Sequence, residues 1–200
     1  MPKWQHLESY TEQAETSNRV LGDYFRAKRG IATGGNSFFI RPRSEWHKMG
    51  ISDEWLSPIL PSPRTFHLSE VTSDESGWPK ESDDALLSIP KSSTYSELPL
   101  PIQNYLASCP EKIRNGYILR HRTPWYSIGR TTAAPIICTY MSRSKETPFR
   151  FIRNRSNAIM TNTYLGLYPQ TSMSEERIDN MCKALNDIPA EVLINGGREY

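Results

Sequence analysis

Residues 149–156 read FRFIRNRS, and this stretch decides how the middle of the chain is interpreted. Successive side chains of a β-strand point to opposite faces of a sheet. A strand here places Phe149, Phe151 and Arg153 on one face and Ile152 on the other. The stretch therefore predicts a strand whose apolar residues are buried and whose arginines lie beside them.

Segments on both sides of this stretch have similar local patterns. ICTYM at 137–141 and TNTYLGL at 161–167 are rich in the β-branched and aromatic residues typical of strands, and ALLSIP at 85–90 reads as a short buried strand. Residues 98–108 are expected to form a short helix. Residues 172–185 predict the clearest helix, with apolar residues at helical spacing and Ser-x-x-Glu at its start.

The segment FRAKRGIATGGNSFFI, residues 25–40, predicts a β-hairpin. Gly34 and Gly35 supply the positive φ angles that a tight turn needs, or mark a point of close backbone approach. A dinucleotide-binding loop requires a strand, a glycine-rich turn and a helix in that order. Because SFFI favours a strand, a phosphate cradle is the less favoured interpretation. Ser44 is expected to cap a helix that runs to about Leu56.

These elements predict an α+β fold: a small mixed or antiparallel sheet with flanking helices and long loops. Three parts are expected: a polar lead-in at 1–20, an α+β domain at 21–170, and a C-terminal helix and tail at 171–200. Fifteen prolines and eleven glycines favour long loops over long regular elements.

The composition also indicates the cellular compartment in which the chain is expected. No stretch approaches the roughly 20 apolar residues of a membrane span, and the N-terminal residues lack the apolar region of a secretory signal. The three cysteines are far apart in the sequence, so neither a disulfide scaffold nor a structural zinc site is expected. A cytoplasmic location and no membrane partner are the simplest expectation.

The charge is unevenly distributed, although the formal net charge is only +2. Residues 113–168 hold nine Lys or Arg and one acid, and residues 19–48 hold seven bases and two acids. Between them, residues 69–99 hold seven acids and two lysines. Two basic segments around an acidic one suit a polyanion, although ordinary solvated surface charge gives the same pattern.

Familiar catalytic signatures are missing from the sequence. It contains no GxSxG, HExxH or GxxxxGK[ST] motif, so serine hydrolases, zinc proteases and P-loop enzymes are not supported. The histidines lack metal-ligand spacing; they are His6, His47, His67 and His121. We therefore predict no catalytic residue and no metal ligand in this chain.

What remains is a candidate recognition surface, in which arginine suits phosphates and guanine edges and asparagine suits adenine edges. Arginines and aromatic residues are dense at 120–130 and again at 149–155. Trp125 and Tyr126 can stack on an unpaired base, or they are core residues with arginines extended over them.

Six segments, in order along the chain, together resemble the C-terminal region of large adenine-specific DNA methyltransferases. These are class I, S-adenosylmethionine-dependent enzymes of the restriction–modification type. The segments are KRGIATGGNSFFI at 28–40, ILPSPR at 59–64, RTPWY at 122–126, TYMSR at 139–143, PFRFIRNRS at 148–156 and TNTYLGLYP at 161–169.

The resemblance implies a target-recognition role for residues 21–170, with double-stranded DNA and a catalytic methyltransferase domain or subunit as partners. The family's catalytic domain carries an Asn-Pro-Pro-Tyr/Phe motif and a glycine-rich S-adenosylmethionine loop. This chain has no Pro-Pro pair and no equivalent glycine loop, so the cofactor is expected in the catalytic partner. The chain is therefore expected to be a C-terminal piece, a separate subunit or a truncated reading frame, and inactive alone.

The resemblance also implies roles for individual residues. The candidates for phosphate or base contacts are Arg122, Arg130, Arg150, Arg153 and Arg155. The candidates for polar base readout are Asn36, Asn154 and Asn162, with a role as turn or cap residues as the alternative for each. Ser37 is the candidate for close approach to the DNA backbone, and Trp125 and Tyr126 are the aromatic candidates. These candidates imply a DNA-binding face formed by the positive side chains of residues 113–168.

Two other functions stay open. The chain could be a scaffold that packs on a separate catalytic domain without binding DNA. It could also be a small enzyme of unknown type, which would need a pocket with perturbed titratable groups.

Overall fold

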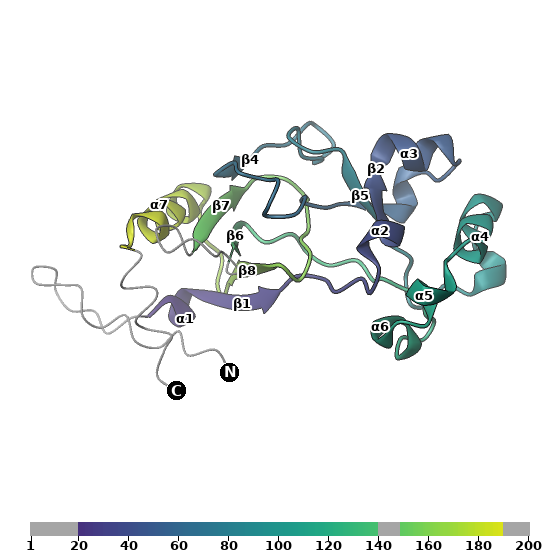
Figure 1. Ribbon diagram of the computed structural model, residues 1–200. Helices are drawn as coiled ribbons and strands as arrows, with labels where there is room; N and C mark the ends of the chain where they lie inside the picture. The colour runs from purple at the N-terminus through teal and green to yellow at the C-terminus, as the bar shows by residue number, and fades with distance from the viewer. Residues whose placement is uncertain (1–19, 140–148, 190–200) are drawn as a thin grey trace, which may run out of the picture.

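The computed structural model describes residues 20–139 and 149–189, which form two β-sheets with helices packed around them (Figure 1). The expected lead-in therefore lies almost wholly outside the described residues. The same holds for the tail beyond 189 and for Tyr140 and Met141 of the strand predicted at 137–141. The combination of sheets and helices confirms the predicted α+β fold.

The larger sheet has five strands in the order β1–β8–β6–β7–β4. Its first three pairings are antiparallel, and β4 runs parallel to β7, so the sheet is mixed. The strands are β1 (Phe25–Arg29), β4 (Glu70–Val71), β6 (Ile136–Thr139), β7 (Arg150–Asn154) and β8 (Tyr164–Pro169). The strands predicted around 137–141, 149–152 and 161–167 are all present.

Strand β7 has the predicted alternation. Phe151 is 1% exposed and lies in a cluster with Ile178 and Leu185 of helix α7 (Glu175–Asp187). Ile152 is fully buried on the opposite face, in a cluster with Tyr164. The sheet therefore has an apolar layer on each side, and α7 covers one of them (Figure 1).

Helix α7 begins two residues later than its sequence predicts. Ser174, rather than Ser172, is the N-cap, and its hydroxyl oxygen accepts a hydrogen bond from the Arg177 backbone N–H. This cap satisfies one of the free N–H groups at the helix start. Asn186 also ties the helix to β7, because its side chain accepts from the Phe151 N–H and donates to the Phe151 carbonyl.

The smaller sheet has three antiparallel strands in the order β2–β5–β3. They are β2 (Ile40–Pro42), β5 (Asp84–Leu87) and β3 (Leu56–Pro58). Strand β5 is the buried strand predicted at 85–90. Helices α2 (Asn36–Phe39), α3 (Arg43–Lys48) and α4 (Leu100–Ala107) pack around this sheet, and α4 confirms the helix predicted at 98–108.

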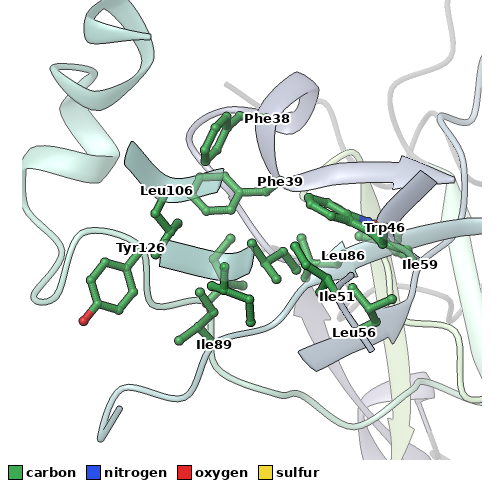
Figure 2. Close-up of a cluster of buried hydrophobic side chains, with 14 of the residues drawn as sticks. Phe38, Phe39, Trp46, Ile51, Leu56, Ile59, Leu86, Ile89, Leu106 and Tyr126 are labelled. Atoms are coloured by element: carbon green, nitrogen blue, oxygen red, sulfur yellow. The ribbon is translucent and has the colours of Figure 1, made fainter. Parts of the chain in front are cut away.

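The core beside the smaller sheet is aromatic and aliphatic (Figure 2). Trp46 is fully buried, and its indole N–H donates to the Ala85 carbonyl at 3.0 Å. The ring of Phe38 stacks on Tyr105 with centroids 4.6 Å apart. Ile59 connects the two halves of the molecule, since it bridges to Ile159 near the larger sheet.

Two predictions in this region are wrong. Residues 25–40 do not form a hairpin, because β1 pairs with β8 while residues 36–39 are the short helix α2 and β2 pairs with β5. The helix expected from Ser44 to Leu56 ends at Lys48, because Gly50 adopts φ +79° and turns the chain toward β3. The hairpin error arises because the strand partners are distant in sequence, whereas the helix error is local. Ser44 lies inside α3, whose N-cap is Pro42, so the predicted cap is also wrong.

The other elements are short. They are α1 (Leu21–Tyr24), the 3-10 turns η1 (Asp53–Trp55) and η2 (Tyr95–Glu97), and the helices α5 (Glu111–Arg114) and α6 (Tyr117–Arg120). Among the described residues, none of the helices has the length and apolar character needed to cross a bilayer.

Phe151→Ala is expected to lower the free energy of unfolding by about 3–5 kcal/mol, because the buried ring leaves a cavity between β7 and α7. Urea denaturation measures this change. Leu100→Ala is the control, since Leu100 is 66% exposed and its loss should change stability by no more than about 0.5 kcal/mol. Equal effects for both variants would show that α7 does not pack on the sheet as described.

Candidate nucleic-acid interface

Arg122 joins two segments that lie about 90 residues apart in the sequence. It follows α6, and its guanidinium donates to the backbone carbonyls of Thr33 at 3.0 Å and Ala32 at 2.8 Å. Burial lowers the pKa of Arg122. This candidate for DNA contact therefore holds α6 against the loop that precedes α2.

The two glycines of that loop allow α5 and α6 to approach closely. Gly34 has φ +83°, and a Cβ built on it would lie 2.1 Å from a methyl carbon of Leu119. A Cβ on Gly35 would lie 2.6 Å from a methyl carbon of Ile113. The glycines mark a close approach between segments, which is the alternative to the hairpin that the sequence left open.

We call residues 111–121 the α5–α6 knob. Ile113 and Leu119 anchor it to the core, while Lys112, Arg114 and Arg120 are exposed. Neither Lys112 nor Arg120 has a carboxylate within ion-pair distance in the described part of the chain, and Arg114 lies over the Trp125 ring at 5.2 Å. The knob also holds the exposed Glu111, so its three cations and one acid give a net charge of +2, and none of the three cations is paired with a carboxylate in the described residues.

Three predicted polar residues lie close to the loop that Arg122 holds. Asn36 and Ser37 are exposed at the start of α2, where Asn36 accepts a hydrogen bond from the Thr33 hydroxyl. Asn162 is also exposed, and its backbone N–H donates to the Ile31 carbonyl at 2.9 Å. The fold thus brings these three residues to the 31–37 loop from two distant parts of the sequence.

Arg153 lies at the other end of the molecule and is only 6% exposed. Its guanidinium pairs with Asp179 at 2.7 Å and with Glu175, both on α7, and donates to the carbonyls of Pro135 and Asn154. All three guanidinium nitrogens of Arg153 donate hydrogen bonds to acceptors within the protein. Arg153 therefore fastens α7 to the sheet and is not open to a DNA phosphate in this structure.

Arg155 belongs to the same ionic network. It pairs with Asp179 at 2.8 Å, with Glu175 at 3.3 Å and with Glu70. Hydrogen bonds from Arg153 and Arg155 lower the pKa of the Asp179 carboxyl below its ordinary value. The hydrogen bonds that Arg155 donates to Asp179, which contributes most, and to Glu70 raise the pKa of Arg155. The positive charge of the two arginines is thus balanced by three acids.

The remaining predicted arginines bind backbone carbonyls. Arg150 donates to the carbonyls of Phe66 and Leu68, and the exposed Arg130 donates to the carbonyl of Glu54. The described basic residues between 113 and 168 therefore do not gather on one exposed face, which corrects the face implied by the sequence. Some are exposed on the knob, and the others hold loops and α7 in place.

Asn154, Trp125 and Tyr126 also have structural roles. Asn154 is 4% exposed, donates to the carbonyls of Ala134 and Ala158, and accepts from the N–H and hydroxyl of Ser156. Tyr126 is 5% exposed and Trp125 packs against the core, as the core interpretation of these aromatic residues expected. Asn154 and Tyr126 are buried, and Trp125 is partly buried with Arg114 over its ring, so all three take part in packing or hydrogen bonds within the protein.

Residues 4–200 match the family described as "Type II methyltransferase M.Eco57I, C-terminal domain". The chain belongs to this family. Across 99% of its length it is 28% identical to Type II methyltransferase M.AccI of Acinetobacter calcoaceticus and 27% identical to Type II methyltransferase M.XamI of Xanthomonas campestris pv. amaranthicola. The resemblance drawn from the six segments is confirmed.

This M.Eco57I-type C-terminal domain spans 36% of the length of each of the two relatives. It corresponds to their C-terminal part, so most of the length of each relative lies outside the matching region. The chain's own described residues contain no group of three or more metal-ligand side chains.

The sequence did not point to the α5–α6 knob of this M.Eco57I-type domain. Lys112, Tyr117 and His121 were not among the candidates, although Arg114 and Arg120 were counted in the charge. Helices of four residues are too short to show a periodic pattern, so no face could be assigned. The available signal was the density of cations at 112–122, where Lys112, Arg114 and Arg120 lie close together in the sequence.

Arg153→Met is expected to lower the free energy of unfolding by about 3 kcal/mol. This is the low end for breaking a buried ion pair, because the freed carboxylates of Glu175 and Asp179 can reach water. Thermal or urea denaturation measures it. Arg153→Lys should rescue little, since one ammonium cannot reproduce the forked contacts. A variant with wild-type stability and weakened DNA binding would reverse the structural assignment.

Proposed function

We propose that this chain is the DNA-contacting, target-recognition region of an adenine-specific DNA methyltransferase, and that the α5–α6 knob faces the DNA. One observation carries the proposal. Lys112, Arg114 and Arg120 are exposed without a carboxylate partner among the described residues, whereas Arg153 and Arg155 are neutralised by α7 and β4. Uncompensated exposed cations are what a DNA backbone attracts most strongly.

Two further cations extend this surface along the chain. Arg26 and Lys28 are exposed on β1, the edge strand that leads into the loop held by Arg122. Together with the knob they supply about five phosphate contacts. Asn36, Ser37 and Asn162 then supply the polar groups for base readout, since phosphate contacts set the register and base contacts give specificity.

Methyl transfer itself is assigned to a separate catalytic domain. The relatives are named type II methyltransferases and are nearly three times as long as this chain. S-adenosylmethionine does not fit beside Gly34 and Gly35, because Leu119 and Ile113 fill the space next to these two glycines. In this division of labour, this chain binds the DNA and recognises its sequence, while the catalytic domain binds the cofactor. Three unpaired cysteines suit a reducing cytoplasm.

A second candidate function is docking on the catalytic domain without DNA binding. One observation favours it: Met49 is 38% exposed and Leu100 is 66% exposed, in chain segments that approach each other where Gly50 meets Pro101. This apolar surface lies outside the α5–α6 knob. The two functions are compatible, since docking at one surface leaves the knob open to DNA.

DNA affinity of the full chain is expected to fall steeply with salt, with a log–log slope of roughly −4 to −5 for about five phosphate contacts. The double variant Lys112→Ala/Arg120→Ala should reduce that slope by about 2. Fluorescence anisotropy of a labelled duplex at several salt concentrations measures both values.

The matched control is Lys91→Ala/Lys183→Ala, which removes the same charge from exposed positions outside the knob. Its slope should stay close to that of the wild type. A flat salt response of the wild type would overturn the proposed function, and equal losses in both double variants would show that only net charge matters.

A further inference from the structure

An exposed aromatic pair lies on the α5–α6 knob. Tyr117, the first residue of α6, is 74% exposed, which makes it the most exposed of the large hydrophobic side chains in the described residues. The His121 ring lies 4.3 Å from it between centroids, tilted by 38°. One ring nitrogen of His121, Nδ1, lies 2.7 Å from the Tyr117 carbonyl oxygen, which fixes the imidazole beside the tyrosine.

The setting of this pair differs from that of the other aromatic residues considered for stacking. Trp125 and Tyr126 pack into the core, and their rings contact other aromatic rings of the protein. Tyr117 instead lies between the exposed cations Arg114 and Arg120 in the sequence. A single exposed apolar residue is common, but a ring held by a neighbouring ring among uncompensated cations has the composition of a nucleobase-stacking platform.

We propose that Tyr117 stacks on a base that has lost its pairing partner in duplex DNA, while Lys112 and Arg120 hold the flanking phosphates. The inference rests on the proposed function and names the form of DNA that the knob prefers. Stacking on an aromatic ring tolerates any base, because every base has a π-face. An enzyme that extrudes its target base leaves such an unpaired base opposite the gap, and stacking there offsets part of the lost pairing energy.

The test compares two labelled duplexes of one sequence, one fully paired and one in which an abasic analogue replaces a single nucleotide. Anisotropy with the full chain at fixed salt gives both affinities. The wild type is expected to bind the duplex with the unpaired base about tenfold more tightly, within the range for one stacked base. Tyr117→Ala should remove that preference and Tyr117→Phe should keep it, because the ring alone is required.

Tyr95→Ala is the matched control, since Tyr95 is a second exposed tyrosine, 42% exposed and outside the knob. It should leave the preference unchanged, and melting temperatures show that each variant is folded. Lys112→Ala/Arg120→Ala should weaken binding to both duplexes equally.

The outcomes distinguish base stacking by Tyr117 from DNA binding by the knob. Loss of the preference in Tyr117→Ala alone supports the inference. If the wild type binds both duplexes equally, or if Tyr117→Ala keeps the preference, the inference is overturned while DNA binding by the knob stands; Tyr117 is then a protein-docking or solvent-exposed residue. Absence of salt-dependent binding to either duplex overturns the proposed function and the inference together.

Discussion

The arrangement of the candidate interface depends on the forked hydrogen bonds from Arg122 to the carbonyls of Ala32 and Thr33. Both acceptors are neutral backbone carbonyls, so these bonds do not neutralise the positive charge of the guanidinium. The bonds hold α6 against a loop that only glycine at position 34 permits, because of its φ of +83° and the nearby Leu119 methyl group. Together with the packing of Ile113 and Leu119 against the core, this contact fixes the knob relative to α2 and the smaller sheet.

The arginines of this chain have two distinct roles, which are set by what surrounds each guanidinium. Arg153 and Arg155 form ion pairs with Glu175 and Asp179, so the charge of the two arginines is neutralised where they hold α7 against the sheet. Arg120 has no such acid within reach in the described residues and stays available. The net charge of a sequence segment is therefore a poor guide to where a polyanion binds. Here the acids Glu175 and Asp179 of α7 pair with Arg153 and Arg155, which are distant from them in the sequence.

Much of the fold follows from local patterns, because the strand alternation around Phe151 and the helical spacing around Ile178 are local properties. Strand partners are not local. Ile40 pairs with Leu86 of a distant segment, so the predicted hairpin fails although Ile40 does lie in a strand. The site was less predictable still, since the role of each arginine depends on acids brought near it by tertiary packing.

Hydrogen–deuterium exchange of the full chain, with and without a DNA duplex, tests the central claim most directly, since amide protection reports which backbone segments the duplex covers or stabilises. The account predicts slower exchange on DNA binding at residues 111–122 and 31–37. Exchange in strand β7 and helix α7 should not change. Protection confined to β7 and α7, or no protection at residues 111–122 under conditions where DNA binds, would contradict the claim that the α5–α6 knob is the DNA-binding surface.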